Sequence, residues 1–149
     1  MYYDMLRARR SIRKFTGKEL ERDKIDKLIK SALLSPSSRS IRPWEFIAVT
    51  DKNALERLSK CREHSSQFLS GASLGIVVIA DPGLSDVWIE DSSIASIIIQ
   101  YSAQSMGLGS CWIQVRNRAH DDKQSAGDYI KEVLGIPEKY CVESMIAIG

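Results

Sequence analysis

Positively charged side chains gather near the start of the sequence. Five cations and one serine fall within eight positions, namely Arg7, Arg9, Arg10, Ser11, Arg13 and Lys14. Arg9 and Arg13 lie on one side of the segment whether it is helical or extended. A guanidinium offers a planar fork of donors that matches two phosphate oxygens, and a serine hydroxyl adds a neutral donor. The cluster therefore indicates an anion site, with a solvated basic face and a nucleic-acid patch as the alternatives.

A second polar group lies between two prolines, in the stretch from Ser35 to Pro43. Each proline fixes its own φ and biases the preceding residue towards extended geometry, so the loop is expected to be pre-shaped. A plain polar connector would have a similar composition. A connector, however, has no need of Trp44 directly behind it. The loop is therefore a second candidate binding element.

Residues that could act as side-chain catalysts are scarce. The two histidines, His64 and His120, have polar neighbours, and no spacing of His, Cys, Asp and Glu resembles a metal site. The acids Glu90-Asp91 and Asp121-Asp122 are adjacent, so the members of each pair do not share a helix face, and they are interpreted as charged ends of elements. Neither common glycine-rich phosphate motif is present. An enzyme of this kind would depend on a bound cofactor.

The composition limits the class of protein. A chain of 149 residues fits one domain, residues 1–149, and 44% hydrophobic with 27% charged residues is ordinary for a globular protein. The net charge of +2 argues against a strong nucleic-acid surface. Three cysteines without a CxxC pair fit a reducing compartment, and the first residues carry no signal-peptide pattern. A cytoplasmic location is therefore expected.

The central element is expected between Trp88 and Val115. From Ile89 to Leu108 almost no continuous polar face remains, which predicts a buried helix, and acidic and amide residues interrupt it too often for a lipid span. Gly107-Leu108-Gly109 should end this helix, and a strand should follow from Cys111. A helix of this kind is either an ordinary core helix or one that a second subunit covers in part.

The other elements follow from periodicity and caps. Helical spacing predicts a helix from Glu21 that Pro36 stops, a short helix capped by Asp51, and a helix from a Ser125/Asp128 capping box to Leu134. Apolar runs predict an interior strand at 44–50, a buried strand at 74–80 and a last strand at 141–148. Four strands separated by helices indicate a three-layer α and β domain, whose strand directions the periods leave open.

Four stretches, taken in order, resemble the nitroreductase family of FMN-dependent oxidoreductases. They are RRSIRKF at 9–15, SPSS at 35–38 with PWEF at 43–46, GLGSCW at 107–112, and MIAIG at 145–149. The resemblance implies an α+β fold, a three-layer α/β sandwich with a central, mostly antiparallel four-stranded sheet flanked by helices. It also implies a homodimer whose long central helices are buried at the interface.

The resemblance further implies FMN sites at the interface, each built by both subunits. Arg9, Arg10, Ser11 and Arg13 would hold the phosphate and ribityl chain. The loop of the partner subunit would lie against the flavin ring with Pro36, Ser37, Ser38 and Ser40. Trp112, Ile113 and Gln114 would line the ring near its reactive N5 edge.

The reaction implied by the resemblance is ping-pong transfer of a hydride from NADH or NADPH, through bound FMN, to a nitroaromatic or quinone. Neither a metal, a nucleic acid nor a membrane is part of it. A flavin-binding protein without turnover is one alternative, and a relative that performs reductive dehalogenation or flavin breakdown is another.

The sequence departs from the family pattern at three places. Ser40 stands where the family usually has Asn, and Arg42 stands where Gln is common. We expect Arg42 either to stabilise reduced flavin or to receive an anionic substrate group. The sequence given ends at Gly149, where family members continue into a tail that reaches the partner. The span from Ala80 to Trp88 is too short for the helical insertion of larger members, which predicts an open, permissive site.

Overall fold

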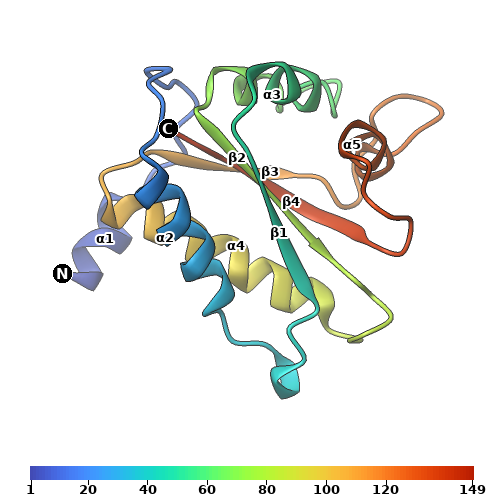
Figure 1. The fold of residues 1–149 in the computed structure, drawn as a ribbon, viewed down its shortest axis with the longest axis horizontal. Helices are drawn as coiled ribbons and strands as arrows, with labels where there is room; N and C mark the ends of the chain where they lie inside the picture. Colours follow the sequence, from blue (N-terminus) through green and yellow to red (C-terminus); the bar gives the residue numbers. More distant parts are fainter.

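A four-stranded antiparallel sheet forms the centre of the computed structural model, which describes residues 1–149 (Figure 1). The strands are β1 (Trp44–Val49), β2 (Leu74–Ala80), β3 (Ser110–Gln114) and β4 (Cys141–Ile148), in the spatial order β1-β2-β4-β3. Every neighbouring pair is antiparallel. The α+β fold with an antiparallel sheet is thus confirmed.

Helices cover both faces of this sheet and complete the three layers (Figure 1). One face carries α2 (Arg22–Leu33) and α4 (Trp88–Ser105), with α1 (Tyr2–Ala8) against α4. The other face carries α3 (Lys52–Leu58) and α5 (Ala126–Leu134). Two short 3-10 turns, η1 (Ser38–Ser40) and η2 (Gln67–Gly71), lie in the connections.

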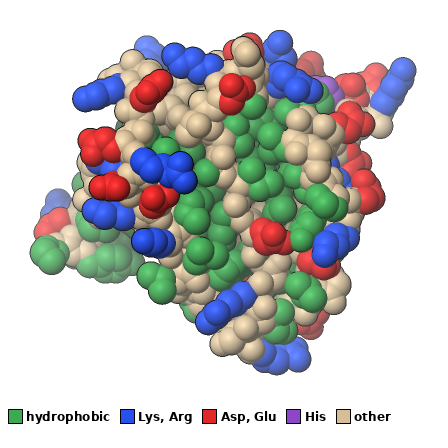
Figure 2. Space-filling model, in the orientation of Figure 1, with side chains coloured by type: hydrophobic (Ala, Val, Ile, Leu, Met, Phe, Trp, Pro, Cys, Tyr) green, Lys and Arg blue, Asp and Glu red, His purple; other side chains and the backbone are tan.

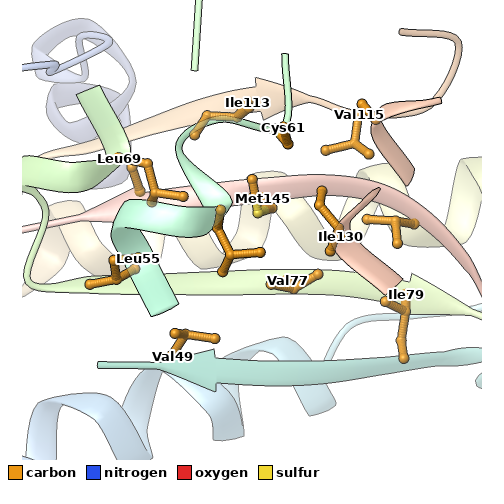
Figure 3. Packing of buried hydrophobic residues seen from close by; sticks show 14 of the residues in the cluster. Val49, Leu55, Cys61, Leu69, Val77, Ile79, Ile113, Val115, Ile130 and Met145 are labelled. Carbon is orange, nitrogen blue, oxygen red and sulfur yellow. The ribbon is translucent and has the colours of Figure 1, made fainter. Parts of the chain in front are cut away.

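Alternation along the strands divides the hydrophobic residues into two cores. Val77 and Met145 face α3 and α5, where they meet Leu55 and Ile130 (Figure 3). The alternate residues of the same strands face α2 and α4 on the other side of the sheet, so that Ile76 and Ile146 pack with Leu28 and Ile99. A fully buried Leu or Ile stabilises the fold by about 1.5–3 kcal/mol relative to an exposed one. The two cores fix the sheet between its helical layers.

The expected end of the central helix is confirmed. Gly107 has φ +74, and its N–H donates to the Gln104 carbonyl at 3.1 Å, while the Leu108 N–H donates to the Ala103 carbonyl at 2.9 Å. This pair of bonds is the Schellman arrangement, which needs a residue that adopts positive φ easily. The strand after it begins at Ser110, one residue earlier than predicted. The glycines at 107 and 109 therefore predicted the end of this helix correctly.

The side-chain caps of two other helices also follow the prediction. Asp51 Oδ2 accepts the Ala54 N–H at 2.9 Å at the start of α3. Ser125 Oγ accepts the Asp128 N–H at 3.0 Å at the start of α5. Each bond satisfies a backbone donor that the first turn of a helix leaves free.

The prediction of an interior strand at 44–50 is wrong, because β1 lies at the edge of the sheet. It pairs only with β2, and its residues Glu45 and Ala48 are exposed. In Figure 2 hydrophobic side chains run down the middle of the face that carries β1. The strand is apolar on both alternating sets because helical layers cover both of its faces, and this pattern says nothing about its position within the sheet.

The prediction that α4 is buried on all sides holds for this chain only in part. Its buried residues include Asp91, Ser92, Ser96 and Gln100, so several polar groups face the sheet. On the outer side Ile94 is 41% exposed, and Ile97, Ile98 and Tyr101 are half-buried. No helix in the structure combines the length and apolar character that crossing a membrane requires. An apolar stripe of α4 therefore remains uncovered in the single chain.

Candidate functional site

The cationic segment runs along the free edge of β3. Helix α1 ends at Ala8, and Arg9 takes an extended conformation with φ −61 and ψ 133. Ser11 forms a parallel bridge with Ser110, and the Ile12 N–H donates to the Ser110 carbonyl at 2.9 Å. Of the two predicted conformations, the structure has the extended one beyond Ala8.

The arginines of this segment lack carboxylate partners. The Arg10 guanidinium donates to the carbonyls of Arg7 and Arg9, each at 2.8 Å, and the Arg13 guanidinium lies 5.8 Å from the centre of the Phe68 ring. All nine ion pairs of the chain are formed by other cations. The segment thus concentrates uncompensated positive charge beside a serine hydroxyl. This donor set fits the phosphate of FMN.

The loop between α2 and β1 has an unusual backbone. Arg39, Ser40 and Arg42 have φ values of 52, 53 and 54, in the left-handed region that side chains disfavour. Ser37 Oγ accepts the Arg42 N–H at 3.0 Å, and the Arg39 guanidinium lies 3.8 Å from an Asp86 oxygen. The predicted pre-shaped loop is present. Its shape is held by side-chain contacts as well as by the prolines.

The predicted ring-lining residues of β3 point to opposite faces of the sheet. Trp112 and Gln114 are half-buried, and the Trp112 indole N–H donates to Gln114 Oε1 at 3.1 Å. Gln114 Nε2 in turn donates to the Arg116 carbonyl at 2.7 Å. The Ile113 side chain is 1% exposed and lies in the core beneath α3 and α5 (Figure 3). Only the main chain of Ile113 is therefore available for the predicted contact.

Sequence reasoning missed a buried ion pair next to this strand. Glu143 is 2% exposed and is the extra residue of a bulge, since Val78 pairs with Ser144 and Ile79 with Val142. Arg116 Nε donates to Glu143 Oε1 at 3.2 Å, and the Ser93 hydroxyl lies 2.6 Å from Oε2. An acid inside the apolar run at 141–148 was the available signal. The pair anchors the chain just beyond Gln114.

Asp91 lies at the end of an element, as predicted, but its side chain faces inward. Asp91 lies in the first turn of α4, but it is only 3% exposed, and its Oδ1 accepts the Ser38 N–H at 3.1 Å. Adjacent acids on a helix face different directions. Glu90 accordingly points to solvent while Asp91 points inward.

Within one chain, the loop and the cationic segment lie apart. The loop leads into β1, and the segment borders β3 at the other edge, which is about 14 Å away for three strand spacings. Along α4, Asp91 contacts the loop and Gln100 contacts Ser110, and nine residues of helix rise about 14 Å. The structure therefore does not bring the two predicted parts of the site together in a single chain.

His120 and the buried Cys61 belong to packing, whereas His64 does not. His64 is exposed, whereas the His120 ring stacks on Tyr129 at 3.9 Å and its Nδ1 lies 3.2 Å from the Cys61 carbonyl. Burial raises the pKa of the Cys61 thiol and that of the Tyr129 hydroxyl. No group of three or more His, Cys, Asp and Glu side chains is placed to hold a metal ion.

Comparison with known proteins gives matches along nearly the whole chain. The model of the nitroreductase family matches residues 6–65 and 61–149. A protein of Archaeoglobus fulgidus, provisionally named NADH dehydrogenase/NAD(P)H nitroreductase, is 38% identical over an alignment of 149 positions that covers 97% of this chain and 82% of that protein. Human iodotyrosine deiodinase 1 is 29% identical over 66 residues, which are 44% of this chain and 23% of the deiodinase.

A solved structure shares both fold and sequence. The FMN-dependent nitroreductase from Clostridium difficile R20291 superposes with a TM-score of 0.96 at 55% identity, covering 97% of this chain and 84% of the other. A likeness of this degree extends to the order and packing of all the elements described above.

Proposed function

The chain belongs to the nitroreductase family, and on that premise we propose that it binds FMN and passes electrons from NADH or NADPH to a small acceptor of the nitroaromatic or quinone type. The family and its named relatives support FMN-dependent oxidoreductase chemistry with NAD(P)H. The acceptor class and a ping-pong order complete the proposal. The observation that carries the proposal is the group of arginines without carboxylate partners beside Ser11.

Two sets of residues for holding FMN would come from one chain. Arg9, Arg10, Ser11 and Arg13 would bind the phosphate and ribityl chain, because they supply charge and donors that no acid of this chain neutralises. Trp112, Gln114 and the main chain of Ile113 would lie along the ring. When bound, FMN supplies the redox chemistry, because it accepts a hydride from NAD(P)H and reduces the acceptor.

The third set of contacts would come from a second copy of the chain. The loop with Pro36, Ser37, Ser38, Ser40 and Arg42 lies too far from the cationic segment to share one flavin in the predicted way within one chain. The uncovered apolar stripe of α4, which includes Ile94 and Ile98, supports a homodimer through this helix. Burying such a stripe is the usual driving force for subunit association.

A ping-pong order fits the residues at the site. No histidine or carboxylate lies among them as a general acid or base, so the chain's contribution would be orientation and electrostatics. The nicotinamide and the acceptor would then use the same side of the ring in turn. Initial rates at several fixed acceptor concentrations should give parallel double-reciprocal lines against NADH. Intersecting lines would contradict the proposal.

Reductive dehalogenation is the second candidate, and the partial similarity to iodotyrosine deiodinase favours it over others. An acceptor screen with nitroaromatics, quinones and iodinated phenols separates the two, since the preferred function predicts turnover with the first two classes.

The three free cysteines support placing the protein in a reducing compartment such as the cytoplasm.

A further inference from the structure

All four buried side-chain polar atoms that lack a hydrogen-bond partner lie in one region of the chain. They are Ser35 Oγ, Trp44 Nε1, Asp91 Oδ2 and Ser92 Oγ. Ser35 and Trp44 flank the loop between α2 and β1, while Asp91 and Ser92 lie in the part of α4 that contacts it. Native structures contain few such atoms, and each calls for a physical explanation. Their concentration marks this loop as the place where the burial of polar groups is least well compensated.

Asp91 makes the one direct bond between α4 and this loop that involves a charge. Its Oδ1 accepts the Ser38 N–H at 3.1 Å, its side chain is almost completely buried, and its Oδ2 has no partner. The positive end of the α4 dipole favours an anion here. A buried carboxylate with one free oxygen is nevertheless poor evidence for stabilisation, because apolar replacements of buried charges are often neutral or better.

The backbone that follows this bond is strained. Arg39, Ser40 and Arg42 all have positive φ within four residues, and none of them is a glycine. Such conformations persist only where surrounding contacts impose them. The turn closes on itself through the Ser40 N–H bond to the Ser37 carbonyl and the Ile41 N–H bond to the Ser38 carbonyl, each at 3.1 Å. Side chains add the Ser38 N–H bond to Asp91 at one end and the Arg42 N–H bond to Ser37 Oγ at the other, with the exposed Arg39–Asp86 pair outside. Asp91 is the buried member of this set.

We propose that Asp91 is a positioning residue of the flavin site, which holds the Ser38–Arg42 backbone in its left-handed form so that the loop presents a fixed surface to the flavin ring. This inference rests on the proposed function, which places the ring against the loop. Asp91 itself does not touch the cofactor. It acts through the Ser38 amide, and the hydrogen bond to that amide helps to hold a conformation that the loop sequence alone disfavours.

The test compares D91A, D91N and S96A. Alanine removes the acceptor, whereas the Asn oxygen can still accept the Ser38 N–H. Ser96 is a matched control, because it is a buried polar residue of the same helix, and its hydroxyl bonds Ser144 at 2.8 Å, away from the loop. We expect D91A to raise amide hydrogen exchange in residues 36–42 about tenfold, to weaken FMN binding about tenfold and to change the visible circular dichroism of bound FMN.

In D91N these three properties should stay near the wild-type values, and in S96A only thermal stability should fall. Exchange is measured without FMN as well as with it. Unchanged loop exchange in D91A overturns the proposal, and so does raised exchange with unaltered FMN affinity and dichroism. If the wild-type protein takes up no FMN, the proposed function fails, and exchange in D91A alone then decides whether Asp91 anchors the loop.

If D91A does not fold, exchange of single amides in the wild-type protein gives the answer. The Ser38 and Arg42 amides should then exchange at least tenfold more slowly than the Arg39 amide, for which the structure gives no acceptor. Equal rates for Ser38 and Arg39 would overturn the proposal.

Discussion

At the scale of the residue, the site is defined by charge that is left unpaired. Arg22 and Arg116 each meet a carboxylate. Arg9 and Arg13 do not, and they lie with two further arginines within one short segment. A cluster of like charges costs free energy unless an anion neutralises it. The cluster is therefore better explained by a ligand that is absent from the single chain than by folding.

Replacing Arg9 by Gln should weaken binding of the FMN phosphate and leave binding of the rest of the cofactor unchanged. Loss of a charge-assisted hydrogen bond costs about 1.5–3 kcal/mol, which is roughly 10- to 100-fold in FMN affinity. Riboflavin, which lacks the phosphate, should bind the variant and the wild-type protein equally. Fluorescence titration with both flavins measures the difference. Arg22→Gln, which breaks an exposed ion pair on α2, is the control, and equal losses for FMN and riboflavin would remove the assigned role of Arg9.

Residues with chemistry were predictable from the sequence to different degrees. The cationic cluster and the Ser-rich loop are contiguous, so their composition indicated both. The roles of Asp91 and Glu143 depend on their burial and on hydrogen-bond partners up to 53 residues away in the sequence. No local sequence pattern contains either. The face that Ile113 occupies follows from strand alternation once the orientation of Trp112 is known.

At the scale of the element, close packing between the cationic segment and β3 positions the arginines. A Cβ on Gly109 would lie 2.9 Å from Ile12 Cγ2, so the two backbones approach closely only because residue 109 is glycine. This contact sets the distance of Ser11 and its neighbours from β3.

Gly109→Ala should therefore destabilise the protein and weaken FMN binding together. Overpacking of this kind costs about 1–3 kcal/mol, because the segment must move away from the strand. Thermal unfolding and FMN titration check both effects. Gly127→Ala in α5 is the matched control, because a Cβ there would make only ordinary contacts, at 3.9 Å with Val115 and Val142. Alanine also favours helix over glycine by about 0.5–1 kcal/mol. An unfolding temperature for G109A equal to that for G127A would contradict this account.

The type of each element was largely predictable from the sequence, whereas the elements that lie beside it in the fold were not. Periodicity, caps and glycine signals located α2, α3, α4, α5 and all four strands within a few residues. The edge position of β1 depends on which strands pair, and a strand apolar on both sides looks the same at an edge or in the middle. The short helix α1 has only seven residues, too few for a clear helical period, and none of its residues is buried.

At the scale of the whole molecule, two observations have one common explanation. They are the uncovered apolar stripe on α4 and the distance between the loop and the cationic segment within one chain. A homodimer through α4 would cover Ile94 and would place the loop of one protomer near the arginines of the other. Ile94 is the member of the stripe that is most exposed in the single chain, so changing it leaves the cores intact.

Ile94→Glu should accordingly give a folded monomer that has lost FMN. Burying a charge in an apolar interface costs far more than the contact provides, so the dimer dissociates. Sedimentation analysis gives the mass, and circular dichroism reports the fold. Ala119→Glu, which adds the same charge in the exposed loop before α5, should leave mass and FMN unchanged. An I94E protein that is dimeric and retains FMN would exclude this interface.

The most direct test of the central claim is the visible absorption spectrum of the purified protein, recorded anaerobically before and after addition of NADH and then NADPH. We expect a yellow protein whose bound FMN loses its absorption near the visible maximum when either nicotinamide is added, and regains it with a quinone. A colourless protein that also takes up no added FMN would overturn the FMN-dependent function, and the arginine cluster would then be a solvated basic face.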